Sequence, residues 1–239
     1  MPHEEMNEQQ VAAYLHIDGR ELAKLASRGQ IPCRKVGGKF RFTKSDVDHW
    51  IELSMPQLDK RRLAGIEKGV SRHHGFAEEE LLLHPMIPDG GLAVPLDART
   101  ADAVIRALVD VADRAGVVHA RVELLNEIRQ REQLCTTAML PGVAIPHPRH
   151  PLPYDIARSF VVVGVTTSGI PFGAEDGSLT RLFFLVCCKD DRTHLHVLAR
   201  LARIFHEPGA IEDFIDSSDT EQLAERILRH EQAALARPS

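Results

Sequence analysis

Two stretches of helical periodicity open the chain. Apolar residues recur three and four positions apart behind Asn7, a favourable N-cap, and this predicts a helix to about Leu15. Asp18 and Glu21 have capping-box spacing that predicts the start of a second helix, and Gly29 is typical of the residue that ends one. Two short helices joined by a tight turn indicate a helix-turn-helix motif.

Strand periodicity follows these helices. Two short alternating runs flank Gly37 and Gly38, a pair that favours a two-residue hairpin turn. The alternation divides the hairpin side chains into an apolar set that faces a core and a basic set that faces water. The apolar set is Val36, Phe40 and Phe42, and the basic set is Lys35, Lys39 and Arg41. A capping pattern from Thr43 to Asp46 begins a third helix, so the whole pattern predicts a small winged helix.

Strands alternate with longer helices in the second half of the chain. The predicted strands are 92–96, 143–145, 159–164 and 181–187, and the predicted helices are 100–115, 119–131, 194–205 and 221–231. Turns are expected at Thr167-Ser-Gly and at Asp176-Gly. The run 159–164 is almost continuously β-branched, which is typical of a strand buried on both faces. The pattern predicts an α/β fold with a mixed sheet covered by helices on both sides.

The segment between these halves has no sustained apolar period. We therefore expect a small N-terminal winged helix-turn-helix domain over residues 1–55, a linker with a short helix over 56–80, and the α/β domain over 81–236. His73 and His74 in the linker are adjacent but have no cysteine or carboxylate at ligand spacing, so they are weak evidence for a metal site.

Composition narrows the function classes. The 239 residues suffice for two small domains. The net charge of −5 shows that the protein is not basic overall, so any contact with nucleic acid must come from a local basic patch. No signal peptide and no run of about 18 apolar residues is present, so we expect a cytoplasmic protein without membrane insertion. The four cysteines have no spacing that predicts a zinc ribbon or a disulfide framework.

Such a local patch exists in the winged helix. Eight basic residues and only two acidic ones lie between Asp18 and Lys44. The candidates for DNA contact lie on the second helix and the hairpin, the elements that reach the groove and the phosphates, and they are Arg20, Lys24, Arg28, Lys35, Lys39 and Arg41. The alternative is an ordinary solvated charged surface.

Four motifs in this region carry a family resemblance. Val11-Ala-Ala-Tyr-Leu, Gly29-Gln-Ile-Pro, Val36-Gly-Gly-Lys-Phe-Arg-Phe and Asp46-Val-Asp-His-Trp resemble the excisionase-type, MerR-related winged-helix family over about residues 6–53. The resemblance implies DNA binding through the second helix and the hairpin. Because one copy offers few base contacts, DNA occupancy is expected to need a homodimer or a partner.

This region departs from the family pattern at two positions. Gly19 replaces a polar contact residue that is common in the family, and Cys33 precedes the hairpin. These departures bear on sequence-specific reading more than on binding itself.

In the second half, Gly142-Val-Ala-Ile-Pro-His147 predicts a short apolar strand that ends at a proline and delivers a histidine to its exposed end. A sheet holds such an imidazole rigidly, as a nucleophile in a transfer site requires. The alternative is a surface histidine beside a turn.

A second histidine, His194, falls in the first turn of its predicted helix, where free backbone N–H groups and the helix dipole favour an anion. If it converges with His147, the two rings surround a site suited to phosphate. Further candidate phosphate donors have guanidinium or hydroxyl groups, and they are Arg131, Arg149, Thr136 and Thr137.

Two other interpretations of these residues remain, and a third is disfavoured. A zinc site could use the second-half histidines His147, His150, His194 and His196. His194 taken alone is also compatible with an ordinary core histidine. ATP-dependent transfer is disfavoured, because the sequence has no glycine-rich nucleotide loop and no carboxylate pair for magnesium.

Five motifs in order carry a second resemblance. They are Arg131-Glu-Gln-Leu-Cys-Thr-Thr-Ala, Gly142-Val-Ala-Ile-Pro-His147, Ile170-Pro-Phe-Gly-Ala-Glu-Asp176-Gly, Arg181-Leu-Phe-Phe-Leu and His194-Leu-His-Val-Leu-Ala-Arg-Leu-Ala202. They resemble the fructose/mannitol-type enzyme IIA domains, type 2, of the phosphoenolpyruvate-dependent sugar phosphotransferase system, which include its nitrogen-regulatory branch.

The resemblance implies that His147 is phosphorylated by a histidine-containing phosphocarrier protein. It also implies that His194 is the hydrogen-bonding companion of His147 and that Arg131 supports the phosphate. We expect no cofactor. Departures from the family pattern stiffen the loops around the histidine and are expected to affect phosphorylation rate or partner choice. They are Ala138, Leu140, Pro141, Pro148 and Gly173.

Joining the halves predicts a regulatory phosphotransferase protein in which phosphorylation of His147 affects DNA binding and transcription or nitrogen regulation. A second hypothesis is a sugar-uptake component that passes phosphate to a IIB protein, with the N-terminal domain docking a protein. A third is a protein-binding regulator that has lost phosphorylation.

Overall fold

The structure, a computed structural model, describes residues 5–15, 17–54, 58, 62–65, 67 and 82–236. The chain divides into two units, one of Met1–Glu80 with Ser239 and one of Leu81–Pro238. Most of the expected linker, including His73 and His74, lies outside the described residues. Within that stretch, residues 62–65 are helical and Leu63 is fully buried.

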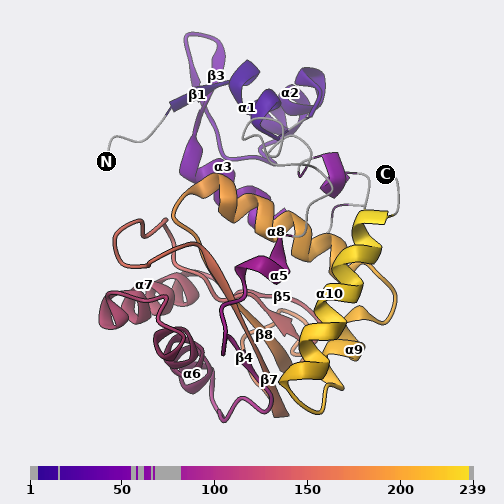
Figure 1. The fold of residues 1–239 in the computed structure, drawn as a ribbon. Helices are drawn as coiled ribbons and strands as arrows, with labels where there is room; N and C mark the ends of the chain where they lie inside the picture. Colours follow the sequence, from indigo (N-terminus) through magenta and orange to yellow (C-terminus); the bar gives the residue numbers. More distant parts are fainter. Residues whose placement is uncertain are drawn as a thin grey trace. The chain divides into compact units, whose positions relative to one another are not determined.

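The first unit is a three-stranded antiparallel sheet with helices (Figure 1). Its elements are β1 (Glu5–Asn7), α1 (Glu8–Leu15), α2 (Gly19–Ser27), β2 (Arg34–Val36), β3 (Lys39–Thr43) and α3 (Lys44–Ser54). The strand order is β1-β3-β2. The helices and the hairpin agree with the sequence prediction, whereas β1 was not predicted.

Local side-chain bonds explain where the first two helices begin. The Asn7 side chain accepts from the Gln10 N–H at 2.9 Å, and the Gln10 side chain accepts from the Asn7 N–H at 2.8 Å, which forms a reciprocal cap. Asp18 caps α2 by accepting from the Arg20 N–H at 2.7 Å. Its expected capping partner, Glu21, forms an ion pair with Arg62.

The hairpin corrects the predicted division of its side chains. The two-residue turn at Gly37-Gly38, both with positive φ, pairs Val36 with Lys39 and Lys35 with Phe40. Directly paired residues share a face of the sheet, so Val36 lies on the basic face and is 51% exposed. The expectation that Val36 faces the core was wrong because the register had not been derived from the turn length.

The second unit is a five-stranded mixed sheet covered by helices (Figure 1). Its strands are β4 (Leu92–Ala93), β5 (Ala138–Leu140), β6 (Val143–Ala144), β7 (Phe160–Ile170) and β8 (Thr180–Cys187), in the order β4-β7-β8-β6-β5. Its helices are α5 (Leu83–Met86), α6 (Ala101–Arg114), α7 (Arg121–Leu134), α8 (Asp191–Phe205), α9 (Ala210–Ile215) and α10 (Thr220–Ala236). The predicted fold class is confirmed.

The central pair of strands, β7 and β8, is buried on both faces. Val162 pairs with Leu185 on the face that packs against α6 and α7. On the other face, the ring of Phe184 contacts those of Phe205 at the end of α8 and Phe214 in α9. Figure 1 shows α6 and α7 on one side of the sheet and α9 and α10 on the other. This arrangement explains the continuous apolar run in the sequence.

Several boundaries differ from the prediction. Thr167-Ser-Gly belongs to β7 and is not a turn, because the strand runs past a register irregularity before it ends at Ile170. The helix predicted from His194 begins at Asp191, and Asp190 is its cap in place of Thr193. The predicted turn at Asp176-Gly is present. The short elements α5, β5 and α9 were missed, since short elements carry little periodicity.

A buried ion pair connects α8, α10 and the start of the second unit. Arg200 donates to Glu231 at 2.8 Å, and both side chains are almost completely buried. The Glu231 carboxylate also accepts the backbone N–H groups of Leu82, Leu83 and His84 at 2.7, 2.8 and 3.1 Å. Removing one member would leave the other charge buried and unpaired, which typically costs about 3–5 kcal/mol. Through the three bonds from the backbone, Glu231 ties residues 82–84 to α10.

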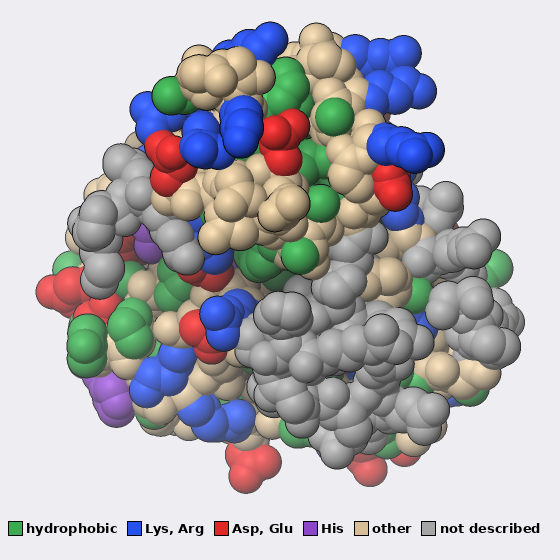
Figure 2. Space-filling model, turned by 90° about the horizontal axis from the view of Figure 1, so that it is seen from above, with side chains coloured by type: hydrophobic (Ala, Val, Ile, Leu, Met, Phe, Trp, Pro, Cys, Tyr) green, Lys and Arg blue, Asp and Glu red, His purple; other side chains and the backbone are tan. Residues whose placement is uncertain are grey.

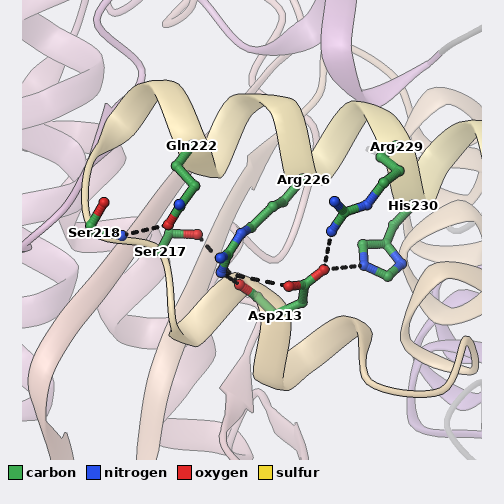
Figure 3. Close-up of polar contacts among 7 residues, drawn as sticks. All are labelled: Asp213, Ser217, Ser218, Gln222, Arg226, Arg229 and His230. Carbon is green, nitrogen blue, oxygen red and sulfur yellow. Dashed lines mark hydrogen bonds and ion pairs between the residues drawn. The ribbon is translucent and has the colours of Figure 1, made fainter.

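A second polar cluster joins α9 to α10 (Figure 3). The Asp213 carboxylate accepts from His230 Nε2 at 2.8 Å and forms ion pairs with Arg226 and Arg229. The His230 ring packs edge-on against Phe214. The hydrogen bond from His230 is the main reason that the pKa of Asp213 is lowered, and the two arginines lower it further.

This cluster predicts a pH-dependent contribution to stability. Because the pKa of Asp213 is lower in the folded state, its charge stabilises the fold above the ordinary aspartate pKa of about 4, and this contribution is lost as pH falls through the lowered value. Asp213→Asn should therefore lower the urea midpoint at pH 7 and have a smaller effect at acidic pH. Urea titrations at both pH values measure this, with the exposed Asp216→Asn as control. A pH-independent difference would contradict the prediction.

Candidate functional site

His147 lies directly beyond β6, where the backbone is held by both neighbours. Strand β6 runs parallel to β8, and the Pro146 carbonyl continues the ladder by accepting from the Val186 N–H at 3.0 Å. On the other side, the Ile145 N–H donates to the Thr137 carbonyl at 3.0 Å. The sheet therefore fixes the backbone up to the residue before the histidine.

Both ring nitrogens of His147 have a partner. Nδ1 lies 2.7 Å from the Ile145 carbonyl oxygen, which can only accept, so Nδ1 carries the hydrogen. Nε2 accepts from Nε of Arg131 at 3.2 Å. These two contacts select the neutral tautomer with the lone pair on Nε2. Nε2 is therefore the nucleophilic atom of this ring.

Arg131 comes from the last turn of α7 and is itself 3% exposed. Its Nη1 donates to the Cys135 carbonyl at 2.9 Å, at the residue where the chain leaves the helix. A guanidinium held in this way places a fixed positive charge and several N–H donors beside Nε2. The arrangement suits a tetrahedral oxyanion attached to that nitrogen.

His194, in α8, is the second histidine at this site. Its ring centroid is 4.9 Å from that of His147, and the rings are inclined at 49°. The sequence-predicted convergence of His147, His194 and Arg131 is therefore present in the geometry. Their roles in phosphoryl transfer remain predictions.

The proposed anion site at the start of this helix is not supported. The His194 N–H is bonded to the Asp190 carbonyl at 3.2 Å, and the Asp190 side chain accepts from the N–H and the hydroxyl of Thr193 at 2.9 and 2.8 Å. Asp191 adds a second carboxylate to the first turn. Because the helix N-terminus already has its anion, an added phosphate would depend on the side chains of His194 and Arg131.

The expectation of an exposed imidazole was wrong, since the His147 side chain is only 2% exposed. Arg131 covers Nε2, the His194 ring lies beside the imidazole, and Pro146 and Pro148 are both buried. Sequence reasoning located the end of the strand but had no information on side chains that cover it. The Arg131 guanidinium thus lies directly against Nε2 in this structure.

The other candidate phosphate donors do not form one group with His147. The Thr136 hydroxyl donates to the Phe172 carbonyl at 2.7 Å, and the Thr137 hydroxyl donates to Glu132 at 2.6 Å. Both hydroxyl hydrogens are thus used by protein oxygens, and support of a phosphate would require those bonds to break. Arg149 is exposed.

Sequence reasoning missed Glu132, which accepts both from the Thr137 hydroxyl and from the Thr137 N–H at 2.8 Å. Burial is the main cause of its raised pKa, although the bonds from Thr137 and the charge of Arg131 act in the opposite direction. The sequence carried two signals for it, its position next to Arg131 at the end of a predicted helix and its place in the first motif of the family resemblance.

A zinc site is not supported. Across the part of the chain that the structure describes, no three His, Cys, Asp or Glu side chains are grouped so that they could hold a metal ion. His150 is exposed while His196 is buried, so the four histidines considered from the sequence do not share one environment.

The predicted DNA-contact residues of the second helix are exposed. Arg20 and Lys24 lie on α2, and Arg28 directly follows it. Figure 2 shows lysine and arginine side chains gathered around a largely uncharged surface, with single acidic side chains beside several of them. This surface suits contact with phosphates.

The hairpin cations are divided between two faces. Lys39 and Arg41 share the face of Val36, whereas Lys35 lies on the other face with its Nζ 5.8 Å from the centre of the Phe40 ring. On β1, Glu5 forms ion pairs with Arg34 and Arg41, the latter at 3.2 Å. Part of the positive charge of the hairpin is thus neutralised within the protein.

Comparison with known proteins agrees with this two-part organisation. Residues 89–230 match the family model described as "Phosphoenolpyruvate-dependent sugar phosphotransferase system, EIIA 2". Residues 6–52 match a model for a helix-turn-helix domain. Both matches lie within the regions for which the sequence analysis gave the same families.

Curated relatives match a little over half of the chain. The chain is 24% identical over 138 residues to the fructose-specific EIIABC component of Bacillus subtilis, with 57% of this chain and 21% of that protein aligned. It is 29% identical over 132 residues to the nitrogen regulatory protein of Bradyrhizobium diazoefficiens, with 54% of this chain and 84% of that protein aligned. The chain thus spans about a fifth of the larger relative and most of the smaller one.

A solved structure shares the fold. The complex of enzyme IIA mannitol with phosphorylated enzyme IIB mannitol from Escherichia coli matches with a TM-score of 0.51 and 19% identity. The match covers 59% of this chain and 95% of that one. Within the described residues, none of the helices combines the length and apolar character needed to cross a membrane.

Proposed function

Because the chain belongs to the EIIA 2 family of the phosphoenolpyruvate-dependent sugar phosphotransferase system, we propose that Nε2 of His147 accepts a phosphoryl group from a histidine-containing phosphocarrier protein. We further propose that this modification regulates DNA binding by the N-terminal helix-turn-helix domain. The protein would then act as a phosphotransferase-linked transcriptional regulator.

The observation that carries the phosphoryl-transfer proposal is the pair of contacts on the His147 ring. Nδ1–H donates to the Ile145 carbonyl, so Nε2 has its lone pair available for bonding to phosphorus. As the new P–N bond forms, the P–N bond to the donor histidine breaks and its electron pair returns to the donor ring. The hydrogen stays on Nδ1 and continues to be donated to the Ile145 carbonyl, so the phosphorylated ring is cationic and the phosphoryl group remains transferable.

Arg131 has two roles in this proposal. In the resting site it covers Nε2, and water is kept from the ring that carries the phosphoryl group. When the donor approaches, the guanidinium moves from Nε2 to the phosphoryl oxygens, where its N–H groups stabilise the developing charge. His194, with its ring 4.9 Å from that of His147, is the second group positioned to donate to those oxygens.

Helix α8 offers a physical connection between the phosphoryl site and the start of the second unit. His194 lies beside His147, and Arg200 lies six residues later on the same helix, about 9 Å along its axis. Arg200 binds Glu231, which holds the backbone of residues 82–84. Phosphorylation adds about −1.5 to −2 charges beside His194. A shift of α8 in response would therefore reach the segment that leads to the DNA-binding domain.

The alternative function is that of a sugar-uptake component. Its support is the fructose-specific EIIABC relative and the fold shared with a IIA protein that was solved with its IIB partner. In this case a IIB protein would take the phosphoryl group from His147, and the N-terminal domain would dock a protein.

The first prediction of the proposed function concerns phosphorylation. Incubation with phosphoenolpyruvate, enzyme I and the phosphocarrier protein should give an acid-labile label on the wild type and none on His147→Ala. Arg131→Ala should slow labelling by about 100-fold, the usual effect of removing a charge-stabilising donor. Phosphate-binding gels measure the rates, and His150→Ala, an exposed histidine on the same loop, is the matched control.

Two outcomes would decide against the phosphorylation proposal. Unlabelled wild-type protein would favour a regulator that has lost phosphorylation. Label in the wild type that persists in His147→Ala would place the acceptor elsewhere. Label that moves to a IIB protein and then to a sugar would favour the uptake function.

The second prediction concerns coupling. Phosphorylation of the wild type should change its apparent affinity for DNA by at least about fivefold, a typical lower value for allosteric coupling, and His147→Ala treated in the same way should not respond. Fluorescence anisotropy against a selected DNA sequence measures the affinity. Equal affinities of both forms, with no difference in oligomeric state, would exclude the coupling.

The third prediction concerns the hairpin. Glu5→Gln should release Arg34 and Arg41 for contact with phosphates, and this should strengthen DNA binding. The slope of log K against log salt concentration should steepen by up to about 1.8, about 0.9 for each additional phosphate. Asp46→Asn, which removes an exposed carboxylate on α3, is the control. An unchanged salt slope would show that these two arginines do not contact DNA.

A further inference from the structure

The backbone that leads to His147 departs from a regular antiparallel ladder. Strands β5 and β6 pair Ala138 with Ala144 and have a register shift between Ala138 and Leu140. Extending the pairing of Ala138 by one residue places Thr137, just before β5, opposite Ile145, just after β6. The Ile145 N–H donates to the Thr137 carbonyl at 3.0 Å, which is half of the exchange expected in a hydrogen-bonded pair. The other half would run from the Thr137 N–H to the Ile145 carbonyl.

The Glu132 side chain, instead of the Ile145 carbonyl, accepts the Thr137 N–H. Its Oε1 accepts the Thr137 N–H at 2.8 Å, and its Oε2 accepts the Thr137 hydroxyl at 2.6 Å. The Ile145 carbonyl, which loses its ladder partner in this way, accepts Nδ1–H of His147 at 2.7 Å. The Glu132 carboxylate therefore binds the Thr137 N–H, and the His147 imidazole binds the Ile145 carbonyl.

We propose that Glu132 is a positioning residue for phosphoryl acceptance, because it withdraws the Thr137 N–H and leaves the Ile145 carbonyl to select the His147 tautomer. This inference rests on the proposed function of His147. It adds a residue to that site without assigning Glu132 any contact with phosphorus.

The unfavourable burial of the Glu132 carboxylate supports a positioning role. Burial disfavours its charged form and raises the pKa of Glu132 despite two bonds from Thr137 and the nearby charge of Arg131. A less polar side chain would be cheaper to bury here. Arg131 and Glu132 are neighbours in the last turn of α7 and affect different nitrogens of the His147 ring. Arg131 contacts Nε2 directly. Glu132 acts on Nδ1 indirectly, through the backbone of Thr137 and Ile145.

Three substitutions test the inference in the full chain. Glu132→Ala removes the acceptor, so the Thr137 N–H should return to the Ile145 carbonyl and compete with Nδ1–H. Glu132→Asp keeps the charge but shortens the reach by one methylene. Glu132→Gln keeps an oxygen that can accept the Thr137 N–H, so it is the conservative variant expected to restore wild-type behaviour. Glu123→Ala, an exposed carboxylate on the same helix, is the control.

The primary readout is the ¹⁵N chemical shifts of the His147 ring at neutral pH, which report the tautomer without any phosphorylation. The wild type, Glu132→Gln and Glu123→Ala should show protonated Nδ1 and unprotonated Nε2. Glu132→Ala and Glu132→Asp should show a mixture with the Nε2–H tautomer. Phosphorylation of these two should slow on the order of tenfold, because in that tautomer no lone pair points toward the donor.

The outcomes separate this inference from the proposed function. Unchanged ring shifts in a folded Glu132→Ala or Glu132→Asp would overturn the positioning role, whatever the phosphorylation rate. Ring shifts that change equally in Glu132→Gln would also overturn it, since the conservative variant would not rescue. Should Glu132→Ala fail to fold, Glu132→Asp gives the answer. Failure of wild-type phosphorylation, with the predicted ring shifts, would remove the function but keep the positioning.

Discussion

The candidate site in the second unit depends on the hydrogen bond from Nδ1 of His147 to the Ile145 carbonyl. A carbonyl oxygen only accepts, so this bond determines which ring nitrogen is protonated and leaves the lone pair on Nε2. The bond needs a backbone that does not move, and β6 provides it by pairing with the buried strand β8. The burial of β7 and β8 on both faces thus determines the chemistry of one side chain.

Burial of the His147 ring restricts which molecules could react with it. His147 is only 2% exposed, so under the proposed function a protein donor would have to displace Arg131 before phosphorus reaches Nε2. Small molecules offer little contact energy to drive that displacement, whereas a protein surface can supply it from contacts remote from the reacting atoms. Under that proposal, coverage of the ring would favour a macromolecular donor and slow loss of the phosphoryl group to water.

Sequence patterns predicted the elements of this fold well and its contacts less well. The caps at Asn7 and Asp18 and the apolar run in β7 depend on residues close in sequence, and these predictions were confirmed. The orientation of Val36 was mispredicted because it depends on hairpin register, and the length of β7 because the pairing with β8 outweighs local turn preference. Such errors come from long-range pairing, which periodicity does not encode.

The candidate site shows the same division. Motifs named the three residues that the geometry brings together, whereas the covering of His147 and the contacts of Glu132 depend on side chains of α7 and on which atoms they reach. Under the proposed function, a charge added to His147 would act first on the side chains beside the ring, which include Arg131 and His194. His194 lies on α8, and Arg200 on the same helix forms a buried ion pair with Glu231. Because close-packed helices shift as units, a displacement of His194 would move α8 as a whole, together with Arg200.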